Sequence, residues 1–111
     1  MLTVHEYVTV EGAIPFRSWL TRLDVTIRAR IQARVLRFET GNLDDHRSVG
    51  LGVWEARCDF GPGYRIYFGR AGSRIVLLLI GGDKASQRSD IRTAHRYWRD
   101  YLEVTTHGAS K

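Results

Sequence analysis

Charged and aromatic side chains that could bind a phosphate alternate along two neighbouring segments of the chain. In the first segment Glu55 and Arg57 lie two residues apart, and in the second Arg65 and Tyr67 have the same spacing. Successive residues of a β-strand point to opposite faces, so each pair shares one face if both segments are strands. We expect a cationic concavity with one aromatic ring, on a sheet face that helices do not cover. The alternative is a solvated strand face on which Glu55 or Asp59 pairs with an arginine across the hairpin.

Two further polar residues, Lys84 and Gln87, come where the last helix should begin. The free N–H groups and the positive dipole end of a helix N-terminus favour a phosphate. We therefore add Lys84 and Gln87 to the residues that would bind a polyanion.

Other kinds of catalytic site have little support in the sequence. The four histidines are scattered among strand, loop, helix and tail, and Asp44-Asp45 is a close acidic pair in a loop. The nucleophile-elbow pattern GxSxG and the phosphate-loop pattern GxxxxGK[ST] are both absent from the sequence. The spacing of histidines and the single cysteine offers no metal site. We expect neither a metal nor another cofactor.

The composition points to a polyanionic partner. The chain of 111 residues has a net charge of +5, and among its 17 basic residues only Lys84 and Lys111 are lysines. Arginine can grip a phosphate bidentately and stack on bases, although a GC-rich genome would also favour arginine over lysine. The lone Cys58 favours a reducing compartment, and no signal peptide or membrane-spanning run is visible. We expect a cytoplasmic protein that does not engage a membrane.

Hydrophobic periodicity predicts the order β-α-α-β-β-β-α. The expected strands cover residues 2–10, 51–60, 64–70 and 74–80, and the expected helices cover residues 15–23, 25–40 and 85–102. Residues 42–50 read as a polar loop without an element, and Gly81-Gly82 as the end of the sheet. The prediction is a single α+β domain over residues 1–103, mainly antiparallel, with helices packed on one sheet face, followed by a flexible tail over residues 104–111.

The second predicted helix has caps at both ends and a basic face. Asp24 is a suitable N-cap, and Gly41 is the expected residue just after the C-terminus. Arg30, Arg34 and Arg37 share one side of this helix. Such a side is more often solvated or used for docking than for binding nucleic acid.

Three ordered motifs resemble those of the RelE/ParE toxin superfamily, in particular the HigB-like addiction-module killer proteins. The motifs are GVWEAR at residues 52–57, GPGYRIYF at residues 61–68, and LLLIGGDKASQ at residues 77–87 followed by Asp90-Ile91. The resemblance covers nearly the whole chain, and it implies a RelE-like fold and a toxin of a type II toxin-antitoxin system. Its partners would be a helix-turn-helix antitoxin, the ribosome and mRNA.

The resemblance also implies an activity and roles for the candidate residues. The activity would be ribosome-dependent, metal-independent cleavage of mRNA, in which the 2′-OH attacks the adjacent phosphate. Arg65 matches the catalytic arginine of RelE-like nucleases and would hold the phosphate together with Arg57. Lys84 and Tyr67 would transfer protons or stack on bases. The strand lysines of RelE have no lysine counterpart here, and Glu55 could accept the proton instead.

Two other functions fit the same sequence. The RelE/ParE fold also supports inhibitors of DNA gyrase, which need no catalytic residues. A non-catalytic nucleic-acid-binding module would need only the basic charge. The cluster of Arg57, Arg65 and Lys84 favours the nuclease.

Overall fold

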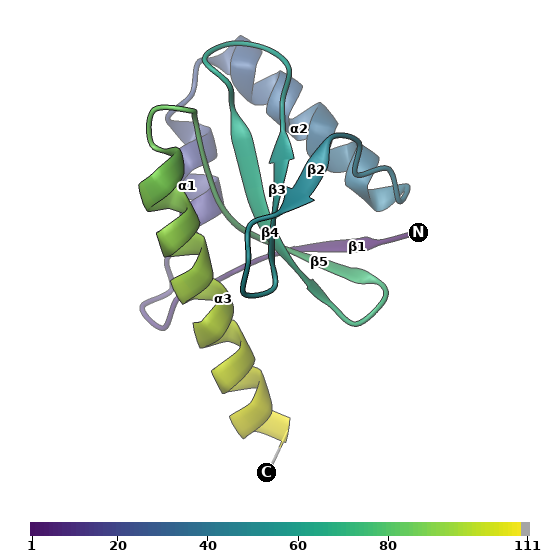
Figure 1. The fold of residues 1–111 in the computed structure, drawn as a ribbon, viewed down its shortest axis with the longest axis vertical. Helices are drawn as coiled ribbons and strands as arrows, with labels where there is room; N and C mark the ends of the chain where they lie inside the picture. The colour runs from purple at the N-terminus through teal and green to yellow at the C-terminus, as the bar shows by residue number, and fades with distance from the viewer. Residues whose placement is uncertain (110–111) are drawn as a thin grey trace.

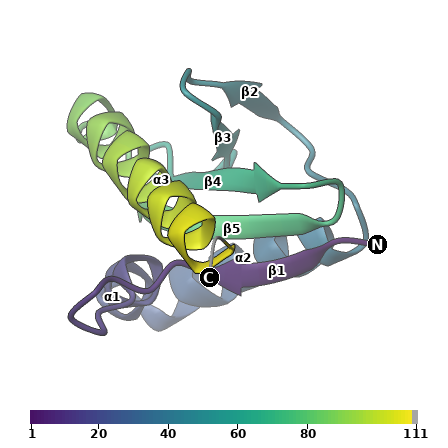
Figure 2. The same cartoon turned by 90° about the horizontal axis from the view of Figure 1, so that it is seen from below.

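A five-stranded mixed sheet forms the centre of the molecule, with helices on both of its faces (Figures 1 and 2). The computed structural model describes residues 1–109, and side chains through Thr105. The strand order is β1-β5-β4-β3-β2; β1 runs parallel to β5, and the other neighbouring pairs are antiparallel. The elements are β1 (Thr3–Glu6), α1 (Pro15–Thr21), α2 (Val25–Glu39), β2 (His46–Ser48), β3 (Val53–Arg57), β4 (Arg65–Ala71), β5 (Ile75–Gly82) and α3 (Gln87–Ala109). The predicted α+β class is confirmed.

The two N-terminal helices form where local signals place them. Pro15 opens α1, and the Asp24 side chain accepts a hydrogen bond from the Thr26 N–H at the start of α2. Gly41 follows α2 with a φ of +88°, a left-handed conformation that glycine adopts without steric strain. Both helices pack on one face of the sheet, where Phe16, Ile31 and other apolar side chains form the larger core.

The third helix covers the opposite face of the sheet, so the prediction of helices on one face is wrong (Figure 2). Ala94 and Trp98 of α3 pack against Val53 and Leu77 in a second core cluster. The strands carry apolar side chains on both faces, and these residues can leave water only if a helix covers each face. The sequence had suggested that the sheet face of Glu55 is open. In the structure this face lies partly beneath α3.

Several predicted boundaries also differ from the structure. The segment predicted to lack an element contains β2, an edge strand that pairs with β3. The first strand ends at Glu6, where the pairing with β5 stops. Val8 and Val10 were predicted to lie on the apolar face but are exposed, whereas Tyr7 is buried. The last helix continues to Ala109, into the segment predicted to be a tail, and residues 110–111 of that segment lie outside the described residues. No helix within residues 1–109 has the length and apolarity needed to span a membrane.

Gly81 and Gly82 were predicted to end the sheet, but both residues belong to β5. Tyr67 pairs with Ile80 and Phe68 pairs with Leu78, so Leu79 is an extra residue that shifts the register. Beyond this bulge Gly81 faces α1, where a Cβ atom would overlap the ring of Trp19. Both the bulge and the missing side chain allow α1 to lie close to the sheet.

We expect the substitution Gly81→Ala to destabilise the fold by about 2 kcal/mol, since overpacking a filled core typically costs 1–3 kcal/mol. Urea unfolding followed by tryptophan fluorescence measures the change in the free energy of unfolding. The double variant Gly81→Ala/Trp19→Leu should recover part of the loss, because the smaller side chain makes room for the methyl group. An unchanged urea midpoint for the single variant would contradict this account.

Candidate active site

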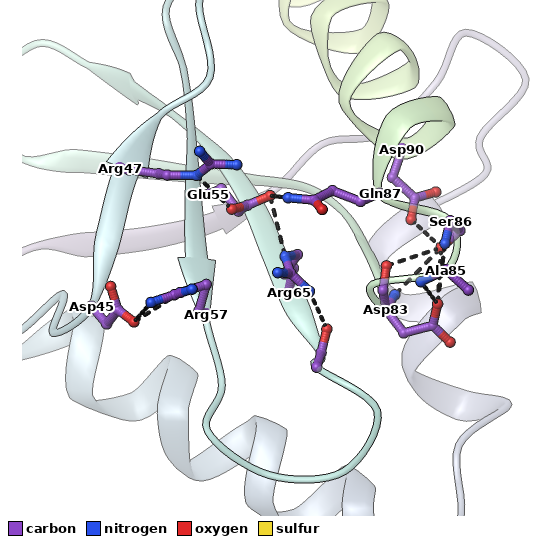
Figure 3. Close-up of polar contacts among 11 residues, drawn as sticks. Asp45, Arg47, Glu55, Arg57, Arg65, Asp83, Ala85, Ser86, Gln87 and Asp90 are labelled. Carbon is purple, nitrogen blue, oxygen red and sulfur yellow. Dashed lines mark hydrogen bonds and ion pairs between the residues drawn. The ribbon is translucent and has the colours of Figure 1, made fainter.

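A buried carboxylate, Glu55, lies where four elements meet (Figure 3). Its side chain is 0% exposed. Arg47 of β2 donates through Nε to Oε1 at 3.0 Å, and Gln87 of α3 donates through Nε2 to Oε2 at 3.0 Å. Arg65 of β4 places Nε 3.5 Å from Oε2. Glu55 thus accepts hydrogen bonds from two donors and pairs electrostatically with Arg65, whose buried Nε forms no hydrogen bond with any described residue.

The protonation state of Glu55 follows from this surrounding. Burial raises the pKa of Glu55, but the hydrogen bonds from Arg47 and Gln87 and the positive charge of Arg47 outweigh it, so the pKa is lowered. A fully buried carboxylate with a lowered pKa is a poor proton acceptor for an external ligand. Glu55 is therefore suited to position its neighbours, in contrast to the role in proton transfer that the sequence suggested.

Arg65 is buried between this carboxylate and a turn. Only 7% of the residue is exposed, and its Nη1 donates to the carbonyl oxygen of Gly63 at 2.7 Å. The sequence predicted a side chain that projects from an open face. The alternation was right, since Arg65 lies on the same face as Tyr67, but the residue is buried and contacts Glu55 and the Gly63 turn. Its guanidinium group is held in one orientation and still lines a cleft of about 190 Å³.

Tyr67 does not reach the surface, contrary to its predicted position on an open face. The residue is 0% exposed, and no described residue forms a hydrogen bond with its hydroxyl group. Burial and then the negative charge of Glu55 raise the pKa of Tyr67. In this conformation the ring can neither stack on a base nor exchange a proton with a ligand.

Arg57 is the exposed member of the predicted set. It lies directly opposite Arg65 in the β3–β4 ladder, and both residues line the 190 Å³ cleft. Nε of Arg57 donates to Oδ2 of Asp45 at 2.9 Å, and Nη2 lies at an ion-pair distance of 2.9 Å from the same oxygen. The paired guanidinium is 55% exposed, so solvent screens this ion pair, and a phosphate could compete for the arginine.

Lys84 and Gln87 line a second cleft, of about 440 Å³, together with Arg47 and Arg88. The Lys84 N–H donates to the carbonyl of Pro62 at 3.3 Å, which holds the lysine beside the turn that contacts Arg65. The structure thus places Lys84 and Arg65 at the same turn. Gln87, however, uses its amide on Glu55 and not on a ligand.

The helix N-terminus itself is less available to a phosphate than predicted. The carboxylate of Asp83 accepts hydrogen bonds from the N–H groups of Ala85 and Ser86, at 3.0 and 3.2 Å. Asp90 in the first turn adds a second carboxyl group, whose pKa burial raises, and the Ser86 hydroxyl donates to it at 2.5 Å. These acidic side chains, shown in Figure 3, already satisfy the positive end of α3.

Two members of the site, Arg47 and Arg88, were missed by the sequence analysis. Arg47 was assigned to a loop without an element, although the Gly50-Leu51-Gly52 turn after it is typical of a hairpin. Arg88 follows Gln87 on α3 and is exposed. Among the side chains described, which end at Thr105, no three histidine, cysteine or acidic residues are grouped as metal ligands.

The resulting arrangement is a cationic surface built around one buried negative charge. Exposed Arg47, Lys84 and Arg88 line one cleft, and exposed Arg57 lines the other together with the less accessible Arg65. A donor held in place, as Arg65 is by its hydrogen bond to Gly63, can stabilise an anion without reorganising as charge develops on it.

Comparison with known proteins provides a relative but no functional description. No family model matches the chain. A protein of Haemophilus influenzae, described as uncharacterized, is 40% identical over 88 residues, which cover 78% of this chain and 89% of the relative. Identity at this level over most of both chains implies a shared fold, and the chain belongs to the same family as this Haemophilus influenzae protein.

Proposed function

We propose that the protein is the toxin of a type II toxin-antitoxin system and a ribosome-dependent mRNA endoribonuclease with a RelE-like fold. The observation that carries the proposal is the rigid placement of Arg65, the arginine of the GYR motif, beside exposed Arg57 and Lys84. Positive charge at these positions suits a phosphodiester. The motif resemblance and the α+β class support the same proposal.

The proposed reaction needs groups that neutralise charge and groups that move protons. The 2′-oxygen attacks the phosphorus and loses its proton, and the 5′-oxygen leaves and gains one. Arg65 and Arg57 would contact the phosphate, and Glu55 would act as a positioning residue for Arg65 and Arg47. Because Glu55 and Tyr67 are buried, proton transfer would fall to exposed groups; Lys84 and Asp45 are titratable side chains that line the two clefts.

One observation favours inhibition of DNA gyrase as a second candidate. Burial removes both Glu55 and Tyr67 from contact with a ligand, so few groups remain for proton transfer. A toxin that acts only by binding does not need them. The site would then serve as a basic docking surface without cleavage.

Brief induction from a tightly controlled promoter tests both candidates. We expect growth arrest, cleavage of ribosome-bound mRNA in ribosome profiling, and rescue by co-expression of a helix-turn-helix protein encoded beside the toxin. Induction of the DNA-damage response without mRNA cleavage would favour gyrase inhibition. Normal growth of several hosts that contain the folded protein would contradict the toxin assignment altogether.

A further inference from the structure

A second basic cavity, of about 340 Å³, lies between α2 and the end of β3, on the sheet face opposite Glu55. Its charged lining consists of Arg30, Arg34, Arg37, Arg57, Asp44, Asp45 and Asp59. Four guanidinium groups against three carboxylates leave an excess of positive charge. The cavity adjoins the 190 Å³ cleft, since Asp45 and Arg57 line both, but its inner wall is formed by α2.

Arg34 forms a rigid cationic floor for this cavity. The residue is 4% exposed, and its Nη2 donates to the carbonyl oxygens of Leu43 at 2.7 Å and Asp45 at 3.3 Å. Its other terminal nitrogen, Nη1, is buried and forms no hydrogen bond with any described residue. A buried donor without an acceptor costs free energy, and an oxyanion would supply the missing acceptor.

The Asp44 carboxylate partly fills the place of such an anion. Its Oδ2 lies 2.9 Å from Arg37 Nη2 but 3.6 Å from Arg34 Nη1, too far for a hydrogen bond. Asp44 is exposed and has a φ of +50°, an uncommon conformation for a residue other than glycine. This carboxylate therefore offsets one of the two arginine charges without satisfying Arg34 Nη1.

Arg30 provides a further charge that no carboxylate among the described side chains neutralises. Its guanidinium carbon lies 3.9 Å from the centroid of the Phe60 ring, and the stacking orients the group over the cavity. Arg30 and Arg37 lie on the same side of α2, about two turns apart. A tetrahedral oxyanion between them would meet donors from several directions.

We propose that the cavity lined by Arg30, Arg34 and Arg37 binds a phosphate group, and that Asp44 competes with it for the same arginines. The ligand chemistry is an oxyanion, either a free phosphate or the phosphodiester of an RNA strand. The inference does not depend on nuclease activity, because these residues lie apart from the Glu55–Arg65 pair.

Titration of the full chain with inorganic phosphate, and separately with a short single-stranded RNA of mixed sequence, tests this site. Arginine Nε–H resonances in NMR spectra report which guanidinium groups respond. We expect Arg30→Gln and Arg37→Gln each to weaken binding by about fivefold, the ratio expected for a strong exposed ion pair. Asp44→Asn should strengthen binding by about the same factor. Arg99→Gln, an exposed change of equal charge on α3, is the control.

Each outcome of these titrations bears on the proposal. Binding of inorganic phosphate with the expected order of variants supports a site for a small phosphate, and binding of RNA alone with that order supports a phosphodiester site. Equal effects of Arg37→Gln and Arg99→Gln would overturn the proposal, because net charge would then explain binding. Weaker binding by a folded Asp44→Asn variant would also overturn it, since Asp44 would be a supporting residue and not a competitor.

Discussion

Replacing Arg65 with alanine is expected to abolish growth arrest and to lower mRNA cleavage by a factor of about 100 or more. Loss of one preorganised charge contact to a transition state typically has an effect of this size. Arg65→Lys should recover only part of the activity, because lysine keeps the charge but lacks the planar fork that contacts both Glu55 and Gly63. Growth after induction and primer-extension mapping of mRNA ends measure the two effects.

The same substitution also affects stability, so a control must separate the two effects. Arg65 is 7% exposed, and its removal deprives the buried Glu55 of one partner. We expect a loss of about 2–3 kcal/mol in the free energy of unfolding. Leu77→Ala, a core truncation of similar expected cost at a residue that forms no polar contact with Glu55, should remain active while it is folded. Growth arrest by a folded Arg65→Ala variant would contradict the proposed role.

The second large effect is expected for Glu55→Ala, which should lower the free energy of unfolding by about 3 kcal/mol or more. The substitution leaves the buried Arg65 without its carboxylate and Gln87 without its acceptor, and it opens a cavity beneath α3. Glu55→Gln should cost less, because the amide fills the space but lacks the charge. Thermal and urea unfolding measure both changes, and Glu103→Gln, an exposed change of the same charge, is the control.

Glu55 should also give the protein a distinct sensitivity to acid. Its pKa is lowered in the folded protein, so its contribution to stability is fully present above the ordinary glutamate pKa of about 4.3 and is lost as pH falls through the lower folded-state value. Asp90 acts in the opposite direction, since its raised pKa favours the folded state most at low pH. The stability difference between wild type and Glu55→Gln should therefore shrink on acidification below pH ~4. A constant difference would show that the charge of Glu55 does not stabilise the fold.

Local patterns predicted most of the elements and the faces of β3 and β4. The caps Asp24 and Gly41 bound α2 as predicted, and the alternation that separates Ala56 from Glu55 holds in the structure. Alternation with a period of two is a property of the backbone itself, so it can be read without knowing what a strand packs against. The α+β class and the antiparallel β3–β4 pairing follow from the same short-range signals.

The tertiary structure decided which side chains can meet a ligand. Periodicity shows that Glu55 and Tyr67 share a face, but only the docking of α3 makes that face a buried one. Charge is tolerated there because Arg47 and Gln87, from an unrecognised edge strand and from the helix, satisfy the carboxylate. Arg47 and Gln87 are separated from Glu55 by 8 and 32 positions in the sequence, and their contacts with Glu55 depend on how the elements pack. The sequence alone therefore predicted residues of the candidate site, whereas packing separated the buried residues from the exposed ones.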